Sequence, residues 1–253
     1  MEDSYNSIQF VSRRERRDKK KKMKMIGLII VILLLAALVT FLLLPISKIN
    51  SIAVNGLELL TAEEVKTQAL MYEGMSYFLA NTEKSKLAIE KLHICKEATV
   101  EKHFPGKIDI NIVENSEVAY LYDKDEWFVV LENGYVSDRV TEIDFSKRPL
   151  ITEWTDVDLL PLLASELYKT KKSVIAEISD IQLSGSEGSE KEVLIYSWEG
   201  YHIYVKLDDF SQQMNKYLEI VETLKGKESE YGIIYLYDTI RFEKFSHGNG
   251  NSR

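Results

Sequence analysis

The chain has 253 residues, a formal net charge of −8 and a single cysteine, Cys95. One cysteine excludes an internal disulfide and a metal site built from several thiolates. Residues 1–25 contain nine Lys or Arg and four Asp or Glu, so this tail carries +5 and the rest of the chain carries −13. The acidic main part argues against nucleic acid as a partner held by charge.

A basic cluster from Arg13 to Lys24 runs into an uncharged apolar segment from Ile26 to Leu44. As a helix, that segment nearly matches the roughly 30 Å hydrocarbon core of a membrane. Lys and Arg next to a span stay on the cytoplasmic side. We therefore predict one transmembrane helix with a cytoplasmic N-terminus, a single-pass type II arrangement.

A cleaved signal peptide is the alternative interpretation of this start. The apolar run is longer than the usual h-region of about 7–15 residues, and no small-x-small cleavage site follows Leu44. Binding of nucleic acid or anionic lipid by the basic tail is a further alternative. Membrane topology alone accounts for the charges, so the retained anchor is favoured.

Residues 48–115 show the order β-α-α-β-β. A strand is expected over Lys48–Val54, and Thr61–Glu64 has the capping-box pattern that begins a helix. A second helix is expected from Asn81 or Thr82, with Leu87, Ala88 and Leu92 facing inward. A hairpin follows, in which residues 98–104 and 108–112 alternate and residues 104–107 form a type II turn, with positive φ at Gly106.

The remainder of the chain is mostly β. The amphipathic pattern from Phe210 to Leu224 predicts the strongest helix, beginning at Asp208, and a second helix follows Asp156 or Asp158. Residues 184–190 read as a polar loop, and residues 247–253 as a disordered tail. Strands are expected at 118–122, 127–131, 149–154, 174–183, 193–198, 201–206 and 232–237.

Motifs of catalysis are missing from the sequence. It contains no Ser-x-x-Lys, Gly-x-Ser-x-Gly or His-Glu-x-x-His, and its four histidines lack ligand spacing. Cys95 could act as a thiol nucleophile, but a buried structural role fits its place between a helix and a strand better. A hydrolase with two carboxylates stays possible and unsupported. We predict no catalytic, cofactor-binding or metal-binding residues.

The final strand, Gly232–Tyr237, is apolar and aromatic, and little of the chain follows it. A final strand is often an edge strand, whose free N–H and C=O groups can pair with a partner chain. The alternative is an internal strand with Tyr hydroxyls at its rim.

The sequence resembles the FtsQ/DivIB cell-division family. The residues that carry this resemblance are Lys48–Gly56, Thr61–Val65, Ala98–Glu114 and Val118–Tyr120. The chain departs from the family pattern in two places: Glu117 replaces a frequent Pro, and Tyr235-Leu236-Tyr237 replaces Asp-Leu-Arg. The resemblance implies an α+β fold with these parts: a basic tail (1–25), a transmembrane helix (26–46), a POTRA domain (47–116), a mostly antiparallel β domain with helices (117–243) and a disordered tail (244–253).

The resemblance also implies a non-enzymatic scaffold of the division complex at the septum. Its partners would be DivIC/FtsB-like and FtsL-like bitopic proteins, without nucleic acid, small-molecule substrate or cofactor. The implied contact is strand addition at the C-terminal edge of the β domain. A membrane-anchored cell-wall enzyme is the alternative function. The residues expected to bind the partner are Ile233, Ile234, Tyr235, Leu236, Tyr237, Ile240 and Phe242.

Overall fold

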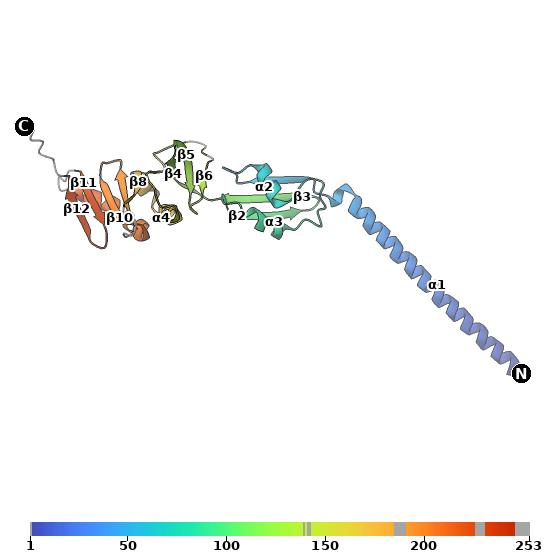
Figure 1. The fold of residues 1–253 in the computed structure, drawn as a ribbon. Helices are drawn as coiled ribbons and strands as arrows, with labels where there is room; N and C mark the ends of the chain where they lie inside the picture. The colour runs from blue at the N-terminus through green and yellow to red at the C-terminus, as the bar shows by residue number, and fades with distance from the viewer. Residues whose placement is uncertain (1, 139, 141–142, 185–190, 226–230, 246–253) are drawn as a thin grey trace, which may run out of the picture. The chain divides into compact units, whose positions relative to one another are not determined.

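The structure is a computed structural model that describes residues 2–138, 140, 143–184, 191–225 and 231–245. The chain divides into two compact units (Figure 1). The first consists of residues 1–55, 62–89 and 98–111. The second consists of residues 56–61, 90–97 and 112–253.

The first unit begins with a long helix, α1 (Glu2–Leu43). Its segment Lys21–Leu43 has a mean hydropathy of 3.2, and in the described part of the chain it alone is long and apolar enough to cross a membrane. The 3-10 helix η1 (Pro45–Ser47) follows directly. The hydroxyl of Ser47 lies 2.7 Å from the carbonyl oxygen of Leu42 and 2.8 Å from that of Leu44, and a bond to Leu42 satisfies an acceptor that the end of α1 leaves without an intrahelical donor.

A three-stranded sheet and two helices follow α1. The strands are β1 (Ser51–Asn55), β2 (Cys95–His103) and β3 (Lys107–Glu114), in the order β1-β3-β2, with β1 and β3 parallel. The helices are α2 (Ala62–Ala69) and α3 (Thr82–Ile89). Apolar side chains from strands and helices form the core, among them Ile52, Val65, Ile89, Ala98 and Ile108. The predicted β-α-α-β-β order is confirmed.

The inward face of α3 differs from the prediction. Leu87 is 60% exposed, whereas Ser85 and Ile89 are buried. The hydroxyl of Ser85 donates to the carbonyl oxygen of Ala69 at the end of α2, over 2.7 Å. A buried serine is tolerated because this bond replaces its bond to water. The expectation for Leu87 was therefore wrong.

The turn between β2 and β3 has the predicted positive φ at Gly106, +70°. The peptide bond between Phe104 and Pro105 in this turn is cis. The carbonyl oxygen of Gly106 accepts a hydrogen bond from the N–H of Asn50 over 2.7 Å. The strand predicted from Lys48 begins only at Ser51, as β1. Residues 48–50 instead precede the strand and bond to the loop around residue 75 and to the turn at Gly106.

The second unit is built on a nine-stranded sheet with the order β12-β11-β10-β9-β8-β7-β4-β5-β6 (Figure 1). Five neighbouring pairs are antiparallel and three are parallel, so the prediction of a mostly antiparallel domain is confirmed. The strands are β4 (Glu117–Asp123), β5 (Glu126–Leu131), β6 (Val136–Ser137), β7 (Leu150–Ile151), β8 (Ile178–Ser184), β9 (Glu192–Ser197), β10 (His202–Lys206), β11 (Gly232–Leu236) and β12 (Ile240–Lys244).

Helices pack on one face of this sheet. Sheet residues such as Ile195, Ile203 and Ile234 form one buried cluster with helical residues such as Leu163 and Phe210. The helical elements are η2 (Val157–Leu159), α4 (Leu160–Lys169), α5 (Lys172–Ile175), η3 (Leu207–Asp209), α6 (Phe210–Met214) and α7 (Tyr217–Lys225).

Three predicted elements of this unit differ from the structure. The strand expected over 149–154 is only β7, and the strand expected from Val174 begins at Ile178, because Val174 and Ile175 belong to α5. The helix expected over 208–224 is interrupted after Met214, where Asn215 accepts a hydrogen bond from the N–H of Lys171 over 2.8 Å. Most of the predicted loop 184–190 and tail 244–253 lies outside the described residues.

Candidate partner-binding edge

The last described strand of the chain is β12, which begins after the expected partner-binding strand. β11 lies between β10, to which it is parallel, and β12, to which it is antiparallel. The expectation that residues 232–237 form the sheet edge was therefore wrong. Among the described strands, β12 forms one edge of the sheet and β6 the other, so Ile240 and Phe242 lie on an edge strand. Alternating residues after Tyr237 were the signal for this extra strand.

The pairing of β11 with β12 depends on Gly232. Its partner in the register is Lys244, and a Cβ at position 232 would overlap the carbonyl oxygen of Glu243. The same Cβ would lie 2.9 Å from the ring of Phe242. A glycine therefore allows the two strands to approach here.

The expected partner-binding residues divide between the two faces of the sheet. Ile234 and Leu236 are 0% and 1% exposed and belong to the core, and Phe242 packs partly against it. Ile233 and Tyr235 are half-buried on the opposite face, as strand alternation requires. Ile234 and Leu236 are therefore not available to a partner through their side chains.

Aromatic side chains and charges cover the face opposite the helices. The ring of Tyr235 stacks on Tyr204 with centroids 5.4 Å apart, and the guanidinium of Arg241 lies 4.2 Å from the Tyr235 ring. The hydroxyl of Tyr235 donates to Glu243 over 3.3 Å, and that of Tyr237 donates to Glu192. Burial, together with these carboxylates, raises the pKa of both tyrosines. Their hydroxyls are therefore donors at neutral pH.

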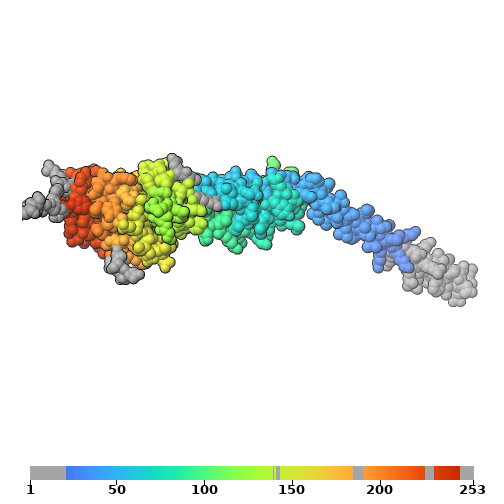
Figure 2. Space-filling view, turned by 45° about the horizontal axis from the view of Figure 1, so that its top comes forward, coloured from blue at the N-terminus to red at the C-terminus, as the bar shows by residue number. Residues whose placement is uncertain are grey.

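The edge strand itself is exposed. Ile240 is 45% exposed, and Arg241, Glu243 and Lys244 are exposed as well. The red atoms of the last strands lie at the surface of the second unit (Figure 2). Because β12 has one neighbour among the described strands, its outward N–H and C=O groups are available to an additional strand.

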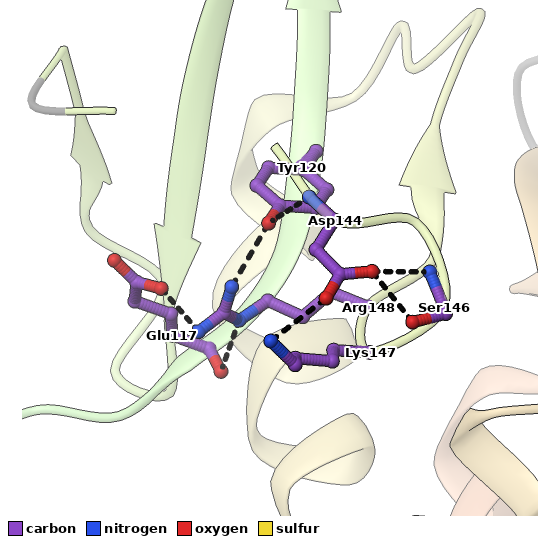
Figure 3. A network of polar contacts seen from close by, with 6 residues as sticks. All are labelled: Glu117, Tyr120, Asp144, Ser146, Lys147 and Arg148. Carbon is purple, nitrogen blue, oxygen red and sulfur yellow. Dashed lines mark hydrogen bonds and ion pairs between the residues drawn. The ribbon is translucent and has the colours of Figure 1, made fainter. Parts of the chain in front are cut away.

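A second candidate site is a cleft of about 580 Å³ beside β4 and α4. It is lined by Ser116, Glu117, Val118, Ser146, Lys147, Arg148, Leu167, Tyr168, Thr170, Lys172, Ile175 and Ala176. Figure 3 shows the polar network along one side of it. The guanidinium of Arg148 pairs with the Glu117 carboxylate and donates to the Tyr120 hydroxyl over 2.9 Å. Glu117, which stands where the family frequently has Pro, thus forms an ion pair with Arg148.

Asp144 completes this network (Figure 3). Its carboxylate accepts from Lys147 over 2.7 Å and from the Ser146 hydroxyl over 2.5 Å, and these contacts lower its pKa to about 2. Its N–H donates to the Tyr120 hydroxyl over 2.9 Å. The cations Lys147 and Arg148 are therefore neutralised by carboxylates, and the network holds the 144–148 loop against β4.

Cys95 and His103, the candidate catalytic residues, do not form an activated nucleophile. Cys95 is buried, and burial, with nearby Glu90 and Glu114, raises its pKa to about 11, so it is a thiol at neutral pH. The His103 imidazole lies 3.2 Å from Asp109 on the strand pair β2–β3. Among the described residues, no group of three or more His, Cys, Asp or Glu could hold a metal ion.

Comparison with known proteins places the chain in a family. Residues 47–115 match the family model "POTRA domain, FtsQ-type". Cell division protein DivIB of Brevibacillus brevis is 30% identical over 206 residues, which cover 79% of this chain and 76% of that protein. DivIB of Bacillus subtilis is 29% identical over 210 residues, covering 82% and 78%.

A solved structure also matches, the major extracytoplasmic domain of the trans isomer of DivIB from Geobacillus stearothermophilus. Its sequence is 24% identical, its TM-score is 0.39, and the match covers 46% of this chain and 98% of that one. With a matching POTRA region and a relative similar over most of both lengths, the chain belongs to the FtsQ/DivIB family of bacterial cell-division proteins.

Proposed function

We propose that this protein is a non-enzymatic, membrane-anchored scaffold that holds other bitopic proteins in the division complex at the septum. The observation that carries the proposal is β12, an exposed strand with one neighbour among the described strands. An added strand would gain main-chain hydrogen bonds, which provide affinity without a deep pocket. The partners are DivIC/FtsB-like and FtsL-like proteins, the former pairing directly with β12.

The proposed topology places the basic tail in the cytoplasm and the chain that follows α1 on the extracytoplasmic side of the membrane. The +5 charge before α1 supports this orientation. Protease added outside intact protoplasts should then digest the chain after residue 47. Protection of the C-terminal part would reverse the proposed orientation.

Side chains on the two faces of β12 would select the partner strand. Ile240 and Phe242 share the helix side, where Phe242 already contacts the core, so apolar partner residues fit there. Arg241 and Glu243 share the tyrosine side, where charged or aromatic partner residues fit. The expected partner strand therefore alternates between apolar and polar residues.

Proline substitution along β12 tests the pairing. Along a strand, successive N–H groups point alternately toward one neighbouring strand and toward the other. One of the two variants Arg241→Pro and Phe242→Pro therefore removes an N–H that points away from β11, and the other removes an N–H that bonds to β11. The full chain in nanodiscs is titrated with the DivIC/FtsB-like partner. The variant that keeps the wild-type melting temperature should lose partner binding. Wild-type affinity in that variant would refute strand addition.

Disulfide cross-linking provides a test that does not depend on proline. In a Cys95→Ser background, Ile240→Cys should cross-link to cysteines at alternate positions of the partner strand. Leu218→Cys is the matched control, because Leu218 is a similarly exposed apolar residue (39%) on α7. Equal cross-linking of both cysteines would place the partner elsewhere. The enzyme alternative finds no support in Cys95, which is a buried thiol.

A further inference from the structure

Three segments of the first unit meet where α1 ends. The N–H of Tyr77 donates to the carbonyl of Ser47 over 2.9 Å, and the N–H of Ile49 donates to Met75 over 2.8 Å. On the other side, the N–H of Asn50 donates to Gly106 over 2.7 Å. The loop around residues 74–80 and the turn around residues 104–106 are thus fixed beside the first residues after the helix.

Exposed apolar side chains gather on these same segments. Leu79 is 80% exposed, Phe104 60%, Phe78 47% and Ile46 42%. We call these four residues the exit patch. The ring of Tyr77 connects two of them, with centroids 5.5 Å from Phe78 and 6.1 Å from Phe104. Isolated exposed apolar residues are ordinary, but a cluster of large ones marks a contact surface.

The exit patch is continuous with the apolar segment of α1. The ring of Phe78 lies 5.7 Å from that of Phe41, which belongs to the span Lys21–Leu43. Phe41 is within one turn of the end of that span. If Phe41 is in lipid, Phe78 lies at the level where the membrane meets water, the level at which aromatic side chains concentrate.

The charges of the three segments agree with an anionic membrane surface. Residues 44–50, 74–80 and 102–108 contain three lysines and no Asp or Glu, in a chain of net charge −8. Lys48 and Lys107 are exposed. The ammonium of Lys102 donates to the carbonyl of Ala80 over 2.7 Å and lies 4.9 Å from the Tyr77 ring. Lysines beside apolar side chains are typical of segments that lie in a membrane interface.

We propose that the exit patch inserts into the interfacial layer of the bilayer that α1 crosses, so that lipid is its partner. Phe78 and Leu79 enter below the headgroups, and Phe104 enters from the neighbouring turn. The exposed lysines meet anionic headgroups. This contact holds the POTRA domain against the membrane independently of any protein bound at β12.

Site-specific fluorescence in nanodiscs tests the proposal with the full chain. In a Cys95→Ser background, Leu79→Cys or Phe104→Cys is labelled with an environment-sensitive dye. Val113→Cys is the control, because Val113 is 53% exposed and lies about 20 Å along β3 from the turn. Discs contain phosphatidylglycerol and phosphatidylcholine, with or without lipids that carry a quencher near the headgroup end of the acyl chain.

Insertion predicts blue-shifted emission and a strong loss of fluorescence with quencher lipids at Leu79 and Phe104, and neither effect at Val113. Emission like that in water at both patch positions would overturn the proposal. Discs that hold one copy distinguish lipid from a second copy of the chain, and quenching that needs two copies would also overturn it. Partner binding measured on the same discs reports on β12 separately.

Discussion

The β2–β3 turn and the β11–β12 pair each contain a glycine that a backbone oxygen approaches closely, but the two glycines are constrained differently. A Cβ at Gly106 would overlap the carbonyl of Lys48, and Gly106 also has a φ of +70°. A Cβ at Gly232 would overlap the carbonyl of Glu243, without a positive φ. Conformation and space both require glycine at 106, whereas only space requires it at 232.

Gly106→Val should give the largest effect. Strain at positive φ and the overlap with Lys48 together should lower the free energy of unfolding by about 2–4 kcal/mol. Urea unfolding of the full chain in detergent, followed by circular dichroism, measures it. Gly74→Val is the matched control, since Gly74 has a φ of +92° and no atom within 4 Å of its Cβ position. Equal losses in both variants would show that strain alone acts at 106.

Gly232→Ala should have a smaller effect that is confined to the sheet edge. The overlap with Glu243 should separate β12 from β11 and lower the free energy of unfolding by about 1–3 kcal/mol. Hydrogen exchange should accelerate at residues 240–244 but not in β9 or β10. Unchanged exchange at 240–244 would contradict the close approach of these strands.

Ile240→Ala should weaken partner binding without affecting folding. Because Ile240 is 45% exposed, its truncation leaves the core intact but removes apolar surface from the edge. We expect a loss of about 1 kcal/mol in binding, or roughly fivefold in Kd, with the melting temperature retained. Leu218→Ala is the control of similar exposure. A fivefold loss in the control would argue against β12 as the specific site.

Tyr237→Phe should give the smallest effect, about 0.5 kcal/mol, because it removes one partly exposed hydrogen bond, to Glu192. The raised pKa of Tyr237 adds a pH dependence. Its stabilisation is complete below pH 10, the ordinary pKa, and is lost as the pH rises from there toward the folded pKa. Unfolding measured between pH 8 and 11 should therefore show a smaller alkaline loss in Tyr237→Phe than in the unsubstituted protein.

Local patterns predicted much of the fold, whereas pairing between distant strands was not predictable from them. The β2–β3 hairpin could be predicted because its alternation and its turn residues are adjacent in sequence. The place of β11 inside the sheet depends on two neighbours. One is β12, whose alternating residues 240–244 follow directly and were not interpreted as a strand, and the other is the parallel strand β10, which is distant in sequence and pairs His202 with Ile233. An internal strand and an edge strand have the same local sequence signals when both alternate.

The prediction of which residues of α3 face the core was wrong for a related reason. Ser85 is polar, and its buried position depends on an acceptor in another helix, the carbonyl of Ala69. Leu87 was predicted to face inward because it is apolar, but it is exposed. At the candidate site, the apolar and aromatic composition of residues 232–242 identified the correct end of the sheet. Which strand forms the edge became clear only from the strand order in the structure.

The hydrogen bonds of residues 47–50 leave no flexible linker between α1 and the domain that follows it. Ser47 closes the end of the helix and is bonded through its carbonyl to Tyr77, while Ile49 is bonded to residues 74 and 75 and Asn50 to Gly106. Rotation of the anchor about its own axis therefore turns this domain with it. Any protein that packs on one side of α1 within the membrane thereby sets the direction in which the domain presents its surfaces.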